Sequence, residues 1–160
     1  MKITIGSDID LYISKLKTLY QATDEHIGKA VYAGADVIAD AIKENLKNLP
    51  TDEGYVKEGK KLKGIKKIQK IGLINSFGIT RIRNDEGLKN VKTGFDGYNL
   101  LKTKKYPQGQ PNAMIARTVE AGNSFTQKHP FVSPAIRANK EAAERKMAQV
   151  IDTEVLKIME

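Results

Sequence analysis

The sequence predicts an α+β fold, in which a small antiparallel sheet is packed by a long helix from the N-terminal half and by a long C-terminal helix. Apolar residues recur every three or four positions in residues 24–49 and again after residue 133, which is the spacing of one helical face. Between these regions, residues 78–83 and 89–95 alternate in polarity around a turn at residues 84–87, which is typical of a β-hairpin. Because 160 residues suit one hydrophobic core, residues 1–160 are expected to form a single domain.

The first helical region divides into two parts. Thr23 is a suitable N-cap, acidic residues follow it in the first turn, and Pro50 ends the helix. A preceding helix is expected from about residue 8 or 10 to residue 21, with either a break or only a kink between the two. The small residues around Gly34 leave a narrow surface that another element can approach closely. The apolar and small face of the second helix consists of Ile27, Ala30, Val31, Gly34, Val37, Ile38, Ala41, Ile42 and Leu46.

The C-terminal helix is expected to begin near Ser133 and Pro134 and to continue to the end of the chain. Serine at the cap and proline at the first helical position follow the usual preferences at a helix start. Its expected buried stripe consists of Ile136, Ala143, Met147, Val150, Ile151, Val155 and Ile158.

Residues 51–110 carry the whole excess of positive charge, with 14 basic against 6 acidic residues, whereas the segments before and after carry net charges of −1 and +1. Residues 51–70 lack helical periodicity and are rich in glycine, so we expect a mobile basic loop there. Clustered ammonium groups bind phosphates and make affinity depend steeply on salt, so these lysines are candidate contacts with a protein partner or DNA. They are Lys57, Lys60, Lys61, Lys63, Lys66, Lys67 and Lys70.

The residues do not support a catalytic, metal or cofactor site. There is no cysteine, which excludes disulfides and thiolate chemistry. Residues 54–61 have the glycine spacing of a phosphate-binding loop, but Lys61 replaces the magnesium-ligating hydroxyl residue and no strand precedes the loop. Ser124 and His129 have no nucleophile elbow, so capping of a turn by the hydroxyl is the better interpretation. His26 lies far from His129 in the sequence, and neither belongs to a spaced set of metal ligands.

No signal peptide and no apolar stretch of bilayer length is apparent, so neither secretion nor membrane insertion is expected.

Several short motifs occur in a fixed order over about residues 25–158. They are Gly72-Leu-Ile-Asn-Ser76, a strand containing Gly94, the helix end Glu120-Ala-Gly122-Asn-Ser124, and Pro130-Phe131-Val-Ser-Pro134-Ala135 at the start of the last helix. In this order the chain resembles the tail-component, or tail-completion, family of tailed phages and prophages. It departs from the usual pattern at Ala121 and Asn123 and in its unusually basic loop.

The resemblance implies a non-enzymatic virion protein of the head-tail junction, made and assembled in the cytoplasm of the host bacterium. Such a protein acts as a subunit of a ring, six-fold by analogy, between the tail tube or tail terminator and the head-completion proteins, with DNA passing through the channel. It also implies that Phe131 is a buried anchor held by Pro130 and Pro134, and that Gly122 stops a helix with a positive φ angle. The alternative function is a DNA-binding accessory protein of a phage or mobile element that uses the basic segment 57–105.

Overall fold

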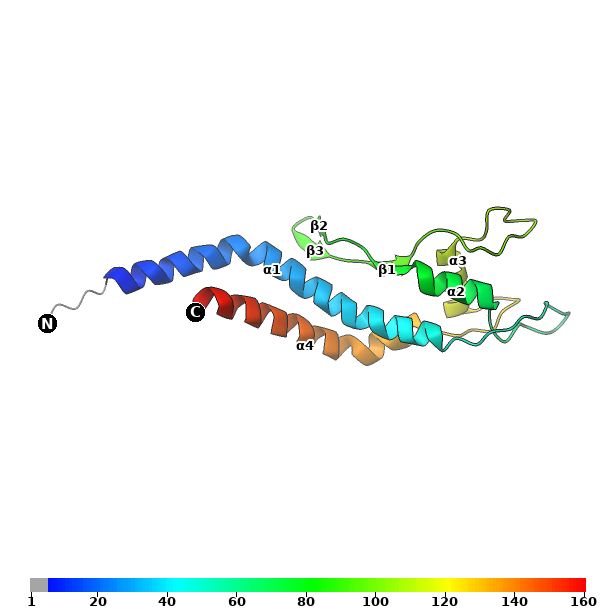
Figure 1. Ribbon diagram of the computed structural model, residues 1–160. Helices are drawn as coiled ribbons and strands as arrows, with labels where there is room; N and C mark the ends of the chain where they lie inside the picture. Colours follow the sequence, from blue (N-terminus) through cyan, green and yellow to red (C-terminus); the bar gives the residue numbers. More distant parts are fainter. Residues whose placement is uncertain (1–5) are drawn as a thin grey trace.

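The computed structural model describes residues 6–160 and shows four helices and four short strands in that range (Figure 1). Their order is α1 (Gly6–Lys47), α2 (Lys67–Ser76), β1 (Phe77–Ile79), β2 (Arg83–Asp85), β3 (Leu88–Asn90), β4 (Thr93–Phe95), α3 (Asn112–Ala121) and α4 (Val132–Met159). The two long helices α1 and α4 run antiparallel, and the shorter elements gather around the C-terminal half of α1. The chain therefore has the predicted α+β fold.

Helix α1 is continuous through the position where the sequence predicts a helix start. The hydroxyl of Thr23 does not cap a new helix but donates to the carbonyl of Leu19, 2.8 Å away within the same helix, and Thr18 bonds to Ser14 in the same way. Because no glycine or proline interrupts residues 18–27, nothing forces the helix to end. Such back-bonding bends helices, and α1 changes direction in its first half without a break (Figure 1).

Helix α4 lies along α1 through small residues. A Cβ atom built on Gly34 would lie only 2.6 Å from Cγ of Met147, so the missing side chain of Gly34 makes room for the Met147 side chain against α1. Ala30 of α1 and Ala143 of α4 are also buried. The narrow surface expected around Gly34 is confirmed.

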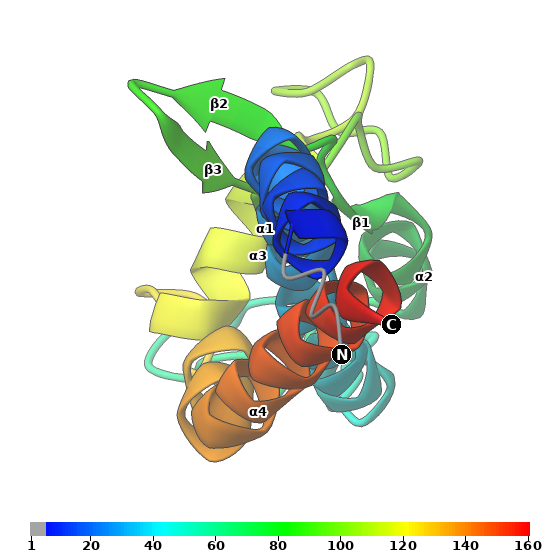
Figure 2. The same ribbon diagram turned by 90° about the vertical axis from the view of Figure 1, so that its left-hand side faces the viewer.

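The buried stripe predicted for α4 is only partly observed. Ala143 is buried and four others of that set are half-buried, but Ile136 and Ile151 are 46% and 38% exposed. The reason is that α4 packs on one side against α1 and has few other neighbours, as the view along the helices shows (Figure 2).

The strands form one long hairpin with two paired regions. β1 pairs with β4 in the register Phe77↔Phe95 to Ile79↔Thr93, and β2 pairs with β3 beyond them. Between the two regions, the hydroxyl of Thr80 accepts from the backbone N–H of Lys92 at 2.9 Å and interrupts regular pairing. The sequence predicted longer strands but placed the turn correctly, since Glu86 and Gly87 both have positive φ angles, as a two-residue type I′ turn needs.

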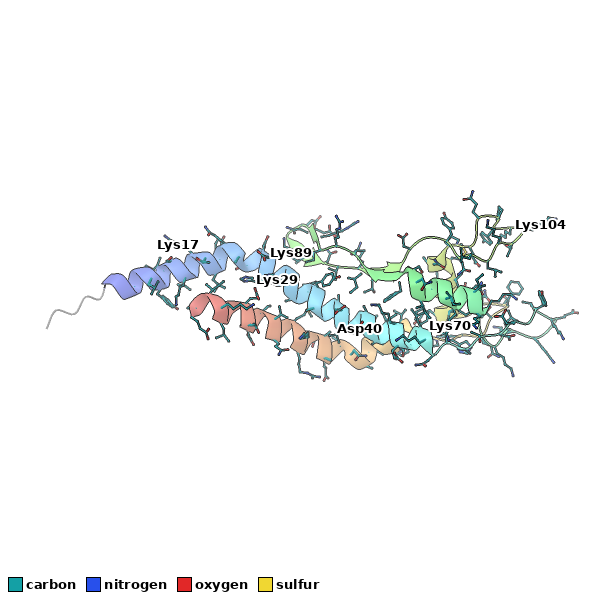
Figure 3. All side chains as sticks on the ribbon, in the orientation of Figure 1. Lys17, Lys29, Asp40, Lys70, Lys89 and Lys104 are labelled. Atoms are coloured by element: carbon teal, nitrogen blue, oxygen red, sulfur yellow. The ribbon has the colours of Figure 1, made fainter. Side chains whose placement is uncertain are left out.

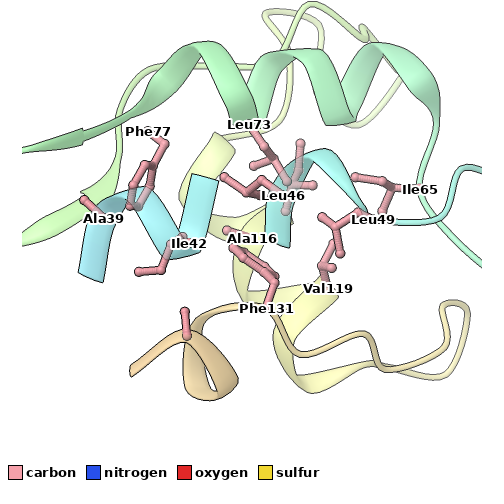
Figure 4. Close-up of a cluster of buried hydrophobic side chains, with 12 residues drawn as sticks. Ala39, Ile42, Leu46, Leu49, Ile65, Leu73, Phe77, Ala116, Val119 and Phe131 are labelled. Carbon is pink, nitrogen blue, oxygen red and sulfur yellow. The ribbon is translucent and has the colours of Figure 1, made fainter. Parts of the chain in front are cut away.

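The hydrophobic core lies where the C-terminal half of α1, α2, α3, β1 and the start of α4 meet (Figure 4). Three aromatic rings form a chain within and beside it: Phe77 lies 5.1 Å from Phe95, and Phe95 lies 6.0 Å from Phe131, in tilted and edge-on arrangements. The buried members are Ala39, Ile42, Leu46, Leu49, Ile65, Leu73, Phe77, Ile115, Ala116, Val119, Phe131 and Ala135.

The position of the core predicts how two leucine substitutions differ. Leu46 is fully buried, so Leu46→Ala should lower the free energy of unfolding by about 2–5 kcal/mol, measured by urea denaturation. Leu156→Ala removes the same atoms from a side chain that is 59% exposed on α4 and should cost much less. Equal losses for the two variants would contradict this location of the core.

Candidate functional site

The start of α4 is capped by a carboxylate from another helix. Glu120, near the end of α3, accepts hydrogen bonds at Oε2 from the backbone N–H groups of Phe131 and Val132, at 2.7 and 2.9 Å. Its Oε1 accepts from the N–H and the hydroxyl of Ser133, at 3.0 and 2.5 Å. The first turn of a helix has N–H groups without hydrogen-bond partners and lies at the positive end of the helix dipole. One carboxylate there accepts hydrogen bonds from these groups and also interacts favourably with the dipole.

The same hydrogen bonds control the ionisation of Glu120. Partial burial acts to raise its pKa, but the Ser133 hydroxyl and the N–H groups of residues 131–133 outweigh burial and lower the pKa to about 2. The group is therefore charged in the folded protein at every ordinary pH.

Gly122 ends α3 with a conformation that favours glycine strongly. Its φ and ψ angles are 71° and 169°, and its N–H donates to the carbonyl of Thr118 at 2.7 Å. A Cβ atom here would lie 3.0 Å from both Cβ and the backbone nitrogen of Lys128. The expected positive-φ helix stop at Gly122 is confirmed.

Phe131 is 1% exposed and joins three elements. Its ring meets Phe95 of β4 edge-on, and its carbonyl accepts a hydrogen bond from the side-chain amide of Asn45 on α1, at 2.9 Å. Pro130 is exposed beside it and Pro134 is half-buried, and both line a shallow depression against the end of α1. The expected burial of Phe131 is confirmed, and it fixes the start of α4 against α1 and β4.

Ser124 does not make the turn that the sequence assigned to its hydroxyl. The turn is held instead by Asn123, whose Oδ1 accepts from the N–H groups of Phe125 and Thr126 at 2.8 and 2.7 Å. Ser124 is exposed, and within residues 6–160 its side chain makes no hydrogen bond. The sequence signal was available, because asparagine is the stronger turn former.

Gly94 lies apart from the capped helix start. It pairs with Gly78 across β1 and β4, and a Cβ atom on either residue would have no neighbour within 4 Å. The pair lies in a shallow depression of about 510 Å³ that is lined by both apolar and polar side chains, among them Ile79 and Lys92. The next residue, Phe95, links the strand of Gly94 to the start of α4, because its ring contacts the ring of Phe131.

A buried pair of amides was missed by the sequence interpretation. Asn99 and Asn112 are almost fully buried; the side-chain amide of Asn99 donates to Asn112 Oδ1 at 3.2 Å and to the carbonyl of Gln69 at 3.3 Å. Asn112 in turn donates to the carbonyl of Asp96 at 2.9 Å. Together they close the loop at residues 97–111 onto α2 and α3.

The basic loop at residues 51–70 is anchored at its base. Asp52 accepts from the N–H groups of Lys63 and Gly54, at 2.9 and 2.8 Å, and these bonds lower its pKa. Glu53 accepts from the N–H of Lys67, where α2 begins, at 2.6 Å. Leu62 also bridges to Thr126 in the turn after α3. Mobility therefore remains a prediction only for the part beyond these anchors, around residues 55–61.

The lysines of this loop differ in environment. Lys70 donates to the carbonyl of Leu49 at 2.8 Å near the end of α1, and Lys66 lies 4.9 Å from the centre of the Tyr55 ring. Lys57, Lys60 and Lys61 are exposed around the tip. Residues 54–61 lead into further loop and not into a helix, because α2 starts only at Lys67, so the segment does not have the arrangement of a phosphate-binding loop.

Among residues 6–160, no group of three or more His, Asp or Glu side chains is placed to hold a metal ion. No helix in this range is long and apolar enough to cross a membrane. Comparisons with known proteins gave no match to any family model, curated protein or solved structure.

The cap predicts a specific pH dependence. Because the pKa of Glu120 in the folded protein lies below the ordinary glutamate value of 4.5, its charge stabilises the fold above about pH 4.5, and this contribution is lost as the pH falls toward 2. Glu120→Gln should therefore be less stable than wild type at pH 7, with a difference that shrinks in acid, as measured by thermal melting from pH 2.5 to 7.

The control for this prediction is Glu141→Gln on the exposed face of α4, where the carboxylate makes one exposed pair with Arg145. It should change the melting temperature little at pH 7. A Glu120→Gln deficit that is equally large at pH 2.5 and 7 would contradict an electrostatic cap.

The glycine at the end of α3 gives a second prediction. Gly122→Ala should lower the free energy of unfolding by about 1–3 kcal/mol, because a residue other than glycine is strained at this positive φ angle. The close approach of the new Cβ atom to Lys128 should increase this loss. Gly94→Ala is the matched control, since its Cβ atom enters open space in a strand, and it should be neutral or slightly stabilising. Chemical denaturation of both variants would show whether the two glycines differ as described.

Proposed function

We propose that this chain is a non-enzymatic structural protein of the virion, acting at the head-tail junction of a tailed phage or prophage as a ring subunit between the tail tube and the head-completion proteins. The observation that carries the proposal is the capped start of α4. Glu120 and Gly122 come from one short motif of the family signature and Phe131 comes from the next, and all three contribute to one junction between α3 and α4. A shared structural role explains why the motifs occur together and in that order.

The shape of the chain supports an assembled protein. The ammonium of Lys15 donates to the carbonyl of Met159, 2.6 Å away, so the end of α4 reaches α1 only at about this position (Figure 1). Further toward its start, α1 has no neighbouring element within the described chain.

Apolar side chains remain uncovered in the first turns of α1, both before and just after Lys15. Four of them recur at helical spacing, which places them on one face, and Tyr20 is 85% exposed, while Leu11 and Tyr12 are exposed beside this set. Contiguous apolar surface of this kind marks an interaction site in a soluble assembly. The residues, named here the α1 stripe, are Ile9, Ile13, Leu16 and Tyr20.

The proposal is tested by assembly. Light scattering and negative-stain microscopy of the purified protein, alone and with the head-completion, tail-terminator and tail-tube proteins of the same virus, should show a ring or a co-assembled complex. The double variant Leu16→Ser/Tyr20→Ser should lose assembly but keep its helix content, because both side chains are exposed in the isolated chain. Ile136→Ser, which removes an exposed apolar side chain from α4, should assemble as wild type does. A chain that stays monomeric with all of these partners would refute the proposed role.

A further inference from the structure

Two lysine-rich loops project from the same end of the molecule, the end opposite the start of α1 (Figure 3). Residues 51–70 hold seven lysines and three acidic residues, and residues 98–110 hold three lysines and no acidic residue. We call these two segments together the basic end. Its net charge of +7 is nearly the whole net charge of the chain, +8.

Hydrogen bonds at their ends fix the two loops to the rest of the fold. The carboxylates of Asp52 and Glu53 accept hydrogen bonds from the backbone N–H groups of Gly54, Lys63 and Lys67. The buried amide of Asn99 fixes the second loop to α2, because it bonds the Gln69 carbonyl and accepts from the N–H of Leu101 at 3.1 Å. The basic end is therefore built on a packed base.

The lysine side chains at the surface of the basic end are not neutralised. Within residues 6–160, no ion pair involves any of its ten lysines, whereas six of the other lysines pair with carboxylates. Two of the ten, Lys66 and Lys70, point to backbone carbonyls. The exposed lysines away from these contacts are Lys57, Lys60, Lys61, Lys63, Lys67, Lys102, Lys104 and Lys105.

We propose that the basic end binds the phosphate backbone of duplex DNA without reading its base sequence. Duplex DNA presents a dense row of negative charges, and neutralising them with ammonium groups releases counterions. The two segments contain no arginine, the residue that most often reads guanine edges in the major groove, so the contact is with phosphate.

A nucleic acid fits this surface better than a protein does. The cores of protein interfaces are depleted in lysine, whereas protein-DNA interfaces are strongly positive. A single strand would need several aromatic rings for base stacking. Tyr55 lies under Lys66, and Tyr106 lies under Lys105 at 5.6 Å, which leaves the exposed Tyr98 as one ring without a lysine over it. Double-stranded DNA is therefore the expected partner.

The inference goes beyond the proposed function, because an isolated subunit is enough to bind the duplex. If the protein binds DNA but never assembles, duplex binding is supported and the role as a ring subunit is refuted. If it assembles without binding DNA, the ring role is supported and duplex binding is refuted.

The experiment measures binding of the full chain to a fluorescent 30-base-pair duplex by anisotropy, at several salt concentrations between 50 and 200 mM. If about six lysines contact phosphate, log K should fall with log salt with a slope of about −5. Two triple variants, Lys57→Gln/Lys60→Gln/Lys61→Gln and Lys102→Gln/Lys104→Gln/Lys105→Gln, should each reduce that slope by about 3 and weaken binding at 50 mM salt by about tenfold or more.

The matched control is Lys17→Gln/Lys140→Gln/Lys146→Gln, which removes the same charge from exposed positions on α1 and α4. It should keep most of the salt dependence. Equal loss of binding in this control would overturn the proposal, because net charge alone would then explain the affinity. Tighter binding to the single strand of the same sequence, or equal competition by polyglutamate, would also overturn it, in favour of a single strand or an acidic protein respectively. Circular dichroism verifies that each variant is folded.

Discussion

The position of α4 depends on the carboxylate of Glu120. A helix that starts next to the core must find partners for its first N–H groups, and here no side chain of α4 itself provides a backbone cap. The carboxylate comes from α3, so one residue fixes the end of one helix to the beginning of another. Phe131, at the same point, fills the core, and its carbonyl is bonded to α1. The direction in which α4 leaves the core is thus set by a small number of polar contacts around one buried ring.

The sequence was sufficient where local chemistry decides the conformation. The apolar periodicity was enough to predict most of α1, and backbone preferences were enough to predict the turn at Glu86 and Gly87. The glycine stop at residue 122, which the family resemblance implied, also suits the backbone freedom of glycine. It failed where the environment decides. Thr23 can cap a helix or bond back within one, and only the surrounding chain selects between these. The stripe on α4 was wrong at Ile136 and Ile151, because periodicity shows which residues share a face but not whether another element covers that face. The remote cap and the pair Asn99 and Asn112 join residues distant in sequence, which no local pattern reveals.

The two parts of the molecule differ in how they are held together. Around the C-terminal half of α1, large apolar side chains from several elements are fully buried. Along the rest of the α1 and α4 pair, the contact depends on small residues, half-buried side chains and ion pairs, such as those of the largely buried Glu154 carboxylate with the more exposed Lys29 and Lys157. Ion pairs with solvated lysines contribute little. Local opening should therefore begin in the two-helix part, which is also where the chain leaves apolar surface for a partner to cover.

The antiparallel arrangement of α1 and α4 also determines where added polypeptide would emerge. Helix α1 begins and α4 ends toward the same end of the molecule, while the loops with most of the lysines lie at the other (Figure 1). A fluorescent protein or affinity tag joined by a linker to either end of the described chain would thus leave the molecule far from those loops. It would instead stand close to the uncovered apolar face of α1. The geometry makes terminal fusions suitable for labelling the lysine-rich surface in its free state, and makes an internal site on the hairpin turn the better choice for following contacts of the two-helix part.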